Sequence, residues 1–356
     1  MGAFPPLRDD LGVMEGYHSP QVDVEVRLNT NESPLPPPAA FVAALAEEVA
    51  TTAFNRYPDR RAWALREALA ELHGGGVTPE NIFVANGSNE VIQCLLLAYG
   101  GPGRVAAVFE PTYAMHSTIA RMTGTAVAQG ERCADFTLDA HEVRRVLEAA
   151  APSVTFLCSP NNPTGRVEPK DLVDEILDRA PGLVLCDEAY GQFASWSALP
   201  MVDEDVALVV TRTYSKTWSM AAARLGYLVG PRRVVAPLWE KAALPYHLDA
   251  LKQAAGRLAV RYTAEMEERV TLLVSERERV AAALGSLPVD TWPSEANFLL
   301  FRPRTRAGPD VWQGLLDRSV LIRNCASWPR LDGCLRVTVG TPAENDRFLA
   351  ALSEVL

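Results

Sequence analysis

The order of apolar and polar residues predicts a repeating strand and helix pattern over the first two thirds of the chain. Short apolar runs with the length of buried strands lie near 82–85, 104–109, 153–158, 183–187 and 206–212. Amphipathic stretches with helical periodicity alternate with them, at 59–72, 88–99, 112–123, 138–150 and 169–179. Strands that alternate with helices form crossover units, so we predict an α/β fold with a mainly parallel sheet flanked by helices.

A different pattern follows this α/β region. A long helical stretch at 249–284 precedes three strands, SEANFLLFRP, SVLIRN and GCLRVTVGT, and one helix around 309–318. That arrangement is typical of a small α+β domain. The start of the chain carries several prolines and little periodicity, which is typical of an arm that packs on a larger body. We therefore predict an arm at 1–35, a large domain at 36–245, and a connector helix with a small domain at 246–356 that the arm completes.

Composition and charge disfavour several classes of function. A net charge of -10 argues against a nucleic-acid partner, because a backbone-binding surface needs clustered positive charge. No apolar stretch approaches the roughly 18 residues of a membrane span. The opening MGAFPPLRDDLG lacks a secretory pattern, so we expect a cytoplasmic protein. The six cysteines include no CxxC pair and the five histidines no HExxH set, so we expect neither disulfides nor a metal site.

Lys216 is the first candidate for chemistry. Only four of the 34 basic residues are lysines, and Lys216 alone among them follows an apolar run, in VALVVTRTYSK. The carboxyl end of a strand is where open α/β sheets hold ligands, and a partly desolvated lysine is an amine nucleophile suited to Schiff-base chemistry. A strand-end lysine that simply reaches water is the competing interpretation, and this segment alone leaves both open.

Two further strand ends carry polar groups suited to a phosphate and a charged ring. Gly87, Ser88 and Asn89 join a strand to a helix whose free N–H groups would bind an anion, although an ordinary helix cap has the same pattern. Asp187 ends a strand that we expect to be buried. Its carboxylate therefore needs a positive partner, either a protonated ring nitrogen or an arginine. Tyr190 can offer a hydroxyl to the same crevice.

An asparagine in a proline-rich turn and three arginines complete the candidates. Asn162 lies in SPNNPTG, where two prolines either hold its amide in one orientation or simply make a rigid turn. Arg336, in the apolar strand CLRVTVGT, needs an anion, which is either a substrate carboxylate or an internal salt bridge. Arg323, in VLIRN, raises the same question, and Arg224 follows Lys216 by eight residues. Strand ends near 86, 159, 187 and 213 share one sheet edge and could converge in a single crevice.

Together these residues resemble the class I/II aminotransferases, which are pyridoxal-phosphate enzymes of fold type I. SPNNPTG, VLCDEAY and TRTYSKTWSMAAARLGY occur in that family's order and spacing. The resemblance implies pyridoxal 5'-phosphate as the cofactor. It also implies that Lys216 binds this cofactor covalently and shuttles the substrate's proton, while Asp187 keeps the ring nitrogen protonated.

The same resemblance implies roles for the other candidates. Tyr190 and Asn162 would hydrogen-bond the phenolic oxygen of the cofactor, and Tyr113 would stack on its ring. The phosphate would be held by Gly87, Ser88, Asn89, Thr213, Ser215 and Arg224. Tyr57, in NRYPD, matches a tyrosine that reaches the cofactor phosphate of the neighbouring subunit, which implies a homodimer.

RLNTNESPLPPP, NRYPD, NGSNEVIQ, EPTYAMH and GCLRVTVGT further resemble the histidinol-phosphate aminotransferases, especially those of actinobacteria. The implied reaction exchanges the amine of histidinol phosphate with the 2-oxo acid acceptor 2-oxoglutarate. Arg336 would bind the α-carboxylate of glutamate, while Tyr17 and Arg323 would meet the distal phosphate of the amine donor. Asn31 and Asn162 would also contact the substrate.

Other functions fit parts of the same pattern. The alternative donor is an aromatic amino acid such as phenylalanine, and the alternative reaction is a decarboxylation of the phosphothreonine type. Leu35, Ser33 in NESP, Trp218 and Ala223 depart from the usual residues of the family, and the indole of Trp218 could alter the pocket wall. A transcription regulator is disfavoured because no DNA-binding helix pair precedes residue 30 and Lys216 is present.

Overall fold

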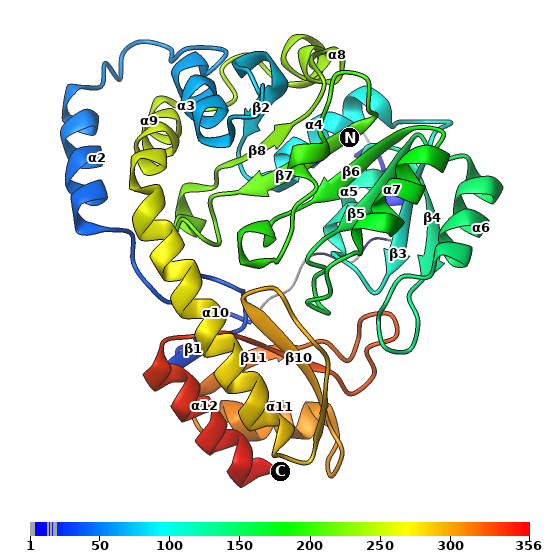
Figure 1. The fold of residues 1–356 in the computed structure, drawn as a ribbon, viewed down its shortest axis with the longest axis vertical. Coiled ribbons are helices and arrows are strands. Elements are labelled where there is room, and N and C mark those ends of the chain that lie inside the picture. Colours follow the sequence, from blue (N-terminus) through cyan, green and yellow to red (C-terminus); the bar gives the residue numbers. More distant parts are fainter. Residues whose placement is uncertain (1–3, 13, 15, 17–19) are drawn as a thin grey trace.

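A seven-stranded sheet forms the larger of two bodies in the computed structural model, which describes residues 4–12, 14, 16 and 20–356 (Figure 1). Its strands, in spatial order, are β2 (Ile82–Ala85), β8 (Gly226–Val229), β7 (Leu208–Thr213), β6 (Leu183–Asp187), β5 (Val154–Cys158), β3 (Val105–Glu110) and β4 (Ala126–Glu131). β8 is antiparallel to both of its neighbours, and the other pairs are parallel. The predicted α/β fold with a mainly parallel sheet is confirmed.

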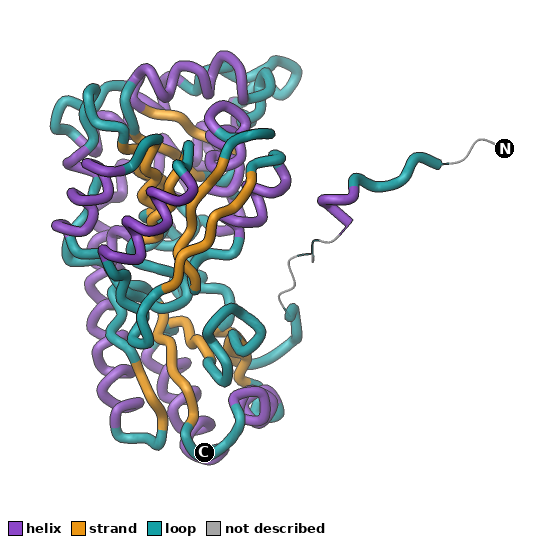
Figure 2. The backbone as a smooth tube through the Cα atoms, turned by 90° about the vertical axis from the view of Figure 1, so that its right-hand side faces the viewer, coloured by secondary structure: helices purple, strands orange, loops and turns teal. Residues whose placement is uncertain are grey.

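Helices cover both faces of this sheet, and each face has its own apolar core (Figures 1 and 2). The helices of this body are α2 (Ala39–Thr51), α3 (Trp63–His73), α4 (Ser88–Tyr99), α5 (Met115–Met122), α6 (Ala140–Ala150), α7 (Lys170–Arg179), α8 (Arg232–Pro237) and α9 (Ala250–Ala259). Successive residues of a central strand enter opposite cores: Leu185 packs with α3, α4 and α9, whereas Val184 and Cys186 pack with α6 and α7. Burial on both faces explains why these strands are continuous apolar runs.

The apolar pattern does not predict two strands of the large sheet. β4 lies at the sheet edge and most of its side chains are exposed or half-buried, so its sequence AVAQGE has no apolar run. β8 has only four residues and lies between Arg224 and Gly230, close to turn signals on both sides. Edge position and short length therefore account for both omissions.

A five-stranded sheet forms the second body, at the lower end of Figure 1. Its strands, in spatial order, are β1 (Val26–Leu28), β11 (Val320–Asn324), β12 (Leu335–Thr338), β10 (Phe298–Pro303) and β9 (Val289–Thr291). α10 (Thr263–Gly285), α11 (Gly308–Leu316) and α12 (Pro342–Val355) enclose its core. β1 pairs with β11 in parallel, so the segment near the start of the chain completes this α+β body as predicted. The domain limits at 35/36 and 245/246 stay a prediction.

The connector between the two bodies differs from the expected single helix at 249–284. It consists of α9, a 3-10 turn at Val260–Tyr262, and α10, which runs along both bodies (Figure 1). A short helix, α1 (Asp9–Gly12), lies near the start of the chain. Among the described residues, no helix is long and apolar enough to cross a membrane, and no three His, Cys, Asp or Glu side chains are grouped as metal ligands.

Candidate active site

A cavity of about 430 Å³ is lined by residues of both bodies and contains most of the candidate residues. It lies at the carboxyl ends of β5, β6 and β7 and at the start of α4, while β11 and β12 contribute an arginine each. The predicted residues that line it are Asn31, Ser88, Asn89, Tyr113, Asn162, Asp187, Tyr190, Thr213, Ser215, Lys216, Arg224, Arg323 and Arg336. Strand ends that are distant in sequence therefore open into one crevice.

Two predicted site residues are not part of the cavity lining. Gly87 directly precedes Ser88 and has a left-handed φ of 81°. Tyr57 is 80% exposed and stacks on Tyr246, with 4.4 Å between the ring centroids. The structure thus places Tyr57 on the surface of the chain, outside the cavity lining. Tyr17 lies outside the described residues.

Lys216 follows β7 and points its amine at the polypeptide segment that enters the second body. Its Nζ donates a hydrogen bond to the carbonyl oxygen of Thr30 at 3.1 Å. Burial, and next the charge of Arg336, lower the pKa of Lys216 from 10.5 to about 7. A neutral amine is the nucleophilic form of lysine, so the surroundings favour covalent chemistry at Nζ. The interpretation of Lys216 as a solvated strand-end charge does not fit this geometry.

Asp187 ends β6 in a buried position, and a histidine lies against its side chain. The Nε2 atom of His116, on α5, lies 2.9 Å from Oδ2 of Asp187, and both side chains are almost fully buried. The other oxygen, Oδ1, accepts hydrogen bonds from the Thr211 hydroxyl and the Ala189 N–H, each at 3.1 Å. The carboxylate is thereby held in one orientation at the cavity, which Asp187 lines. Sequence reasoning missed His116, which lies three residues after Tyr113 in the first turn of α5.

The start of α4 forms a cradle for an anion. Gly87 is the N-cap of α4, and no side chain caps the first turn, so the ordinary-cap interpretation of Ser88 and Asn89 is wrong. Nη1 of Arg224 donates to Oγ of Ser215 at 3.3 Å, and a Cβ on Gly87 would lie 2.8 Å from Nη2 of Arg224. Free helix N–H groups, a guanidinium and hydroxyls around a glycine are the donors that a phosphate monoester requires.

Asn162 and Tyr190 connect the substrate side of the cavity to the arm. Oδ1 of Asn162 accepts from Nη1 of Arg336 at 2.5 Å, and Nη2 of Arg336 donates to the carbonyl oxygen of Asn29 at 2.9 Å. The Tyr190 hydroxyl accepts from Nδ2 of Asn31 at 2.9 Å. The described hydrogen-bond partners of Arg336 are neutral oxygens and not a carboxylate, so its positive charge is available to an anion in the cavity.

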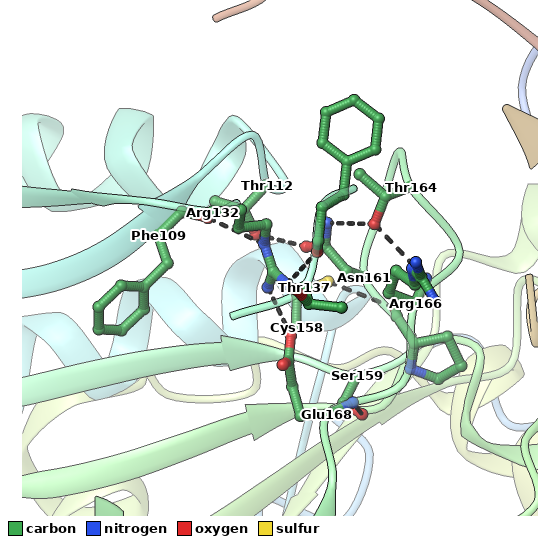
Figure 3. A network of polar contacts seen from close by, with 12 residues as sticks. Phe109, Thr112, Arg132, Thr137, Cys158, Ser159, Asn161, Thr164, Arg166 and Glu168 are labelled. Carbon is green, nitrogen blue, oxygen red and sulfur yellow. Dashed lines mark hydrogen bonds and ion pairs between the residues drawn. The ribbon is translucent and has the colours of Figure 1, made fainter. Parts of the chain in front are cut away.

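A buried polar network supports the turn that carries Asn162 (Figure 3). Arg132 and Glu168 form an ion pair at 2.6 Å, and each side chain is only 1% exposed. Nδ2 of Asn161 donates to the Pro111 carbonyl at 3.0 Å and to Oγ1 of Thr164 at 2.8 Å. Groups buried in this way are costly to displace, so the network fixes the turn at 159–168 against the large sheet.

Several cavity residues carry no signal in the sequence that would single them out. They are Thr30, Glu32, Ala114, Met115, Cys158, Ala189, Ala221, Ala222 and Trp328. Trp218 was the residue expected to alter the pocket wall, and that expectation is wrong. Its indole is 6% exposed, packs near Tyr214 in the large core, and borders a small apolar crevice beside Phe41. The substrate cavity is thus formed without it.

The donor set of the cavity fits pyridoxal phosphate. An amine with a lowered pKa, a buried carboxylate held by a histidine, and an anion cradle lie around one space. These are the groups that a cofactor aldehyde, a protonated ring nitrogen and a phosphate need respectively. These side chains, on an α/β scaffold with a second small body, define the class of pyridoxal-phosphate-dependent transferases.

The chain belongs to the family Aminotransferase class I and II, whose model matches residues 23–352. A histidinol-phosphate aminotransferase from Corynebacterium efficiens is 45% identical, over 98% of this chain and 95% of the relative. One from Frankia casuarinae is 44% identical, over 99% and 90%. The crystal structure of a putative histidinol-phosphate aminotransferase from Erwinia carotovora atroseptica is 26% identical and covers 92% of this chain and 95% of its own, with a TM-score of 0.84.

A more distant structure supports the fold. The histidinol-phosphate aminotransferase of Sinorhizobium meliloti, in complex with pyridoxal-5'-phosphate, is 22% identical, covers 99% of this chain and 98% of its own, and has a TM-score of 0.88. Both bodies therefore have the arrangement of this family's fold.

Proposed function

We propose that the protein uses pyridoxal phosphate to exchange the amine of histidinol phosphate with 2-oxoglutarate, giving imidazole-acetol phosphate and glutamate. The observation that carries this proposal is the identity of 43–45% over at least 98% of the chain with relatives named histidinol-phosphate aminotransferase. The cavity is consistent with such substrates because Arg323 and Arg336, only 8% and 5% exposed, offer two positive groups to anions.

Each residue has a definable part in this reaction. Pyridoxal phosphate, when bound, supplies the electron sink that stabilises negative charge at the substrate Cα. Lys216 would hold the cofactor through its Nζ and, once the substrate amine has displaced it and freed its own amine, take the proton from Cα. Asp187, held by His116, would keep a proton on the ring nitrogen. The start of α4 and Arg224 would hold the phosphate in the cradle described above.

The comparisons do not favour the other two reactions. Relatives that are 43–45% identical to this chain bear one common name, histidinol-phosphate aminotransferase. An aromatic amino acid donor nevertheless lacks the distal phosphate of histidinol phosphate. The cavity could therefore distinguish the two donors by a contact with that phosphate. Arg323 is the group that we assign to that phosphate.

The test is the amine-donor profile of the purified, cofactor-loaded protein. Single-turnover conversion should be fastest with histidinol phosphate and with glutamate, and Arg323→Ala should weaken histidinol phosphate by about tenfold or more while phenylalanine changes little. Lys170→Ala, on the exposed end of α7, is the control. A preference of the wild type for phenylalanine, or release of carbon dioxide, would refute the proposed substrate.

We further propose a homodimer in which Tyr57 completes the site of the partner. Tyr57 and Tyr246 form an exposed aromatic stack, and Phe54 and Leu244, close to them in sequence, are 70% and 77% exposed. Exposed apolar groups of this kind mark an interaction surface. The cytoplasmic location and the division into arm, large domain and small domain belong to the same proposal.

A further inference from the structure

One indole lies beside both arginines of the cavity. Trp328 lines the cavity together with Arg323 and Arg336. The Cζ atom of Arg323 is 5.3 Å from the centroid of the indole, and that of Arg336 is 5.9 Å from the same ring. Both distances are in the range of cation–π contacts, for which tryptophan is the best aromatic partner.

The two arginines are like charges on adjacent strands, and the ring of Phe298, 5.1 Å from the Cζ atom of Arg336, is a second aromatic neighbour of that residue. Arg323 of β11 and Arg336 of β12 stand directly opposite each other in the antiparallel register. Like charges in that position repel, and burial adds the cost of lost hydration. The face of an aromatic ring is electronegative, so the indole of Trp328 offsets part of both costs.

The loop that carries Trp328 is anchored on both sides. Trp328 donates its backbone N–H to the Cys325 carbonyl at 2.9 Å, and its own carbonyl accepts from the N–H of Leu331 at 3.2 Å. Cys325 and Leu331 are themselves buried, in an apolar cluster that also contains Phe136 of the large body. These contacts hold the backbone of the loop, while the indole packs against the same apolar cluster.

We propose that Trp328 is a positioning residue that holds Arg323 and Arg336 ready for the two anionic groups of the substrates. The inference rests on the proposed function, in which a distal anion meets Arg323 and a carboxylate meets Arg336. Each arginine then binds one anionic group, whereas Trp328 affects the affinity of both arginines for their anions. Nothing in the sequence pattern of the loop CASWPRLDGC indicates this role.

The chain contains a matched control for this role. Trp292 is half-buried, packs in the same apolar cluster as Trp328, and has the Cζ atom of Arg302 5.6 Å from its ring. It does not line the cavity. Trp292→Leu should therefore reproduce the packing loss of Trp328→Leu without any effect on the two substrate arginines.

The experiment is calorimetric titration of the cofactor-loaded wild type and of Trp328→Leu, Trp328→Phe and Trp292→Leu. The probes are inorganic phosphate, for the distal site, and succinate, for both sites together. Trp328→Leu should weaken both probes by about tenfold, equivalent to about 1.4 kcal/mol. Trp328→Phe should retain most of the affinity, and Trp292→Leu should bind both probes as the wild type does.

Steady-state kinetics provide the second measurement. In Trp328→Leu the KM values for histidinol phosphate and for glutamate should rise together, with kcat little changed. Unchanged affinities, a loss for one probe only, or an equal loss in Trp292→Leu would overturn the role of Trp328. A wild type that accepts no amine from histidinol phosphate would refute the proposed function instead, while the two titrations would still decide the role of Trp328.

Discussion

Lys216 shows how the surroundings of a single residue tune it for chemistry. Burial, with Arg336 second, lowers its pKa from 10.5 to about 7 in the folded protein. Between those two pH values the unfolded chain holds a proton on this amine that the folded chain lacks. The free energy of unfolding should therefore rise with pH across this window, by up to about 1.4 kcal/mol for each pH unit.

Lys216→Met isolates this effect, because it removes the amine from both the folded and the unfolded state. In cofactor-free protein, we expect the variant to be more stable than the wild type by the largest margin below pH 7. The margin should shrink as the pH rises towards 10.5. Urea denaturation at several pH values measures it. Lys170→Met, at an exposed lysine, is the control variant. A margin for Lys216→Met that is independent of pH would contradict the lowered pKa of Lys216.

At this scale, the sequence predicts a site residue where the residue follows a recognisable local pattern. Lys216 and Asp187 follow apolar runs, and both line the cavity. His116 and Trp328 follow no such pattern. The contact of His116 is with Asp187, 71 positions away in the sequence. Trp328 is a candidate only because its ring lies near two arginines in the folded chain. Trp218 shows the opposite error: its position close to Lys216 in sequence suggested a pocket wall, but its side chain turns into the core.

At the scale of elements, a close approach between β8 and α4 positions the anion cradle. A Cβ added to Gly226 would lie 2.4 Å from the Ser88 nitrogen and 2.7 Å from the Gly87 carbonyl carbon. The backbone of β8 therefore supports the start of α4 directly, and only glycine leaves enough room. This contact explains a glycine in β8 on steric grounds, since its φ is not in the left-handed region.

Gly226→Ala should push the start of α4 away from Arg224 and weaken the hold on pyridoxal phosphate. Loss of one charge-assisted hydrogen bond would lower the affinity for the cofactor by about tenfold or more. Equilibrium dialysis with the cofactor measures the affinity. Gly230→Ala is the matched control, because its Cβ would meet the Val209 side chain at 2.6 Å, away from the cradle. Equal cofactor loss in both variants would show that general strain in the sheet is responsible.

The elements themselves follow from the sequence to different degrees. α4 and the central strands β5 and β6 lie within a residue of their predicted bounds, because burial on both faces leaves continuous apolar runs. The edge strand β4 has no such run, and the 3-10 turn between α9 and α10 lies in an uninterrupted helical pattern. Neither feature can be read from periodicity, since edge pairing and a local change of helix pitch depend on tertiary contacts.

At the scale of the whole molecule, the cavity depends on both bodies. The large sheet supplies the lysine, the carboxylate and the anion cradle, whereas the arginines stand on the small sheet. The fold class could be predicted from the alternation of elements. The contacts of Arg336 with Asn29 and Asn162 could not, because they depend on how β1 pairs with β11 and on how the turn at 159–168 is held. These two hydrogen bonds join residues that are 307 and 174 positions apart.

The proposed dimer makes a prediction about shared sites. If Tyr57 serves the cofactor of the partner subunit, a variant at Tyr57 and a variant at Lys216 damage different halves of each site. Tyr57→Ala should weaken cofactor retention, and Lys216→Ala should be inactive. A hybrid of the two chains contains one site with an intact Lys216 from one chain and an intact Tyr57 from the other. Isologous symmetry requires that arrangement, with one damaged and one complete site in each hybrid.

Mixing the two variants under conditions that exchange subunits should therefore restore activity. With equal amounts and random pairing, half of the dimers are hybrids with one complete site, so activity should approach about a quarter of the wild-type value at limiting cofactor. Each variant mixed with itself is the control. Activity that never exceeds the sum of the separate variants would contradict the role of Tyr57 across the interface, even if sedimentation shows a dimer. A rise in activity would require the exposed Tyr57 and Tyr246 stack to lie at the subunit contact, because no surface position remote from the partner could supply the missing group.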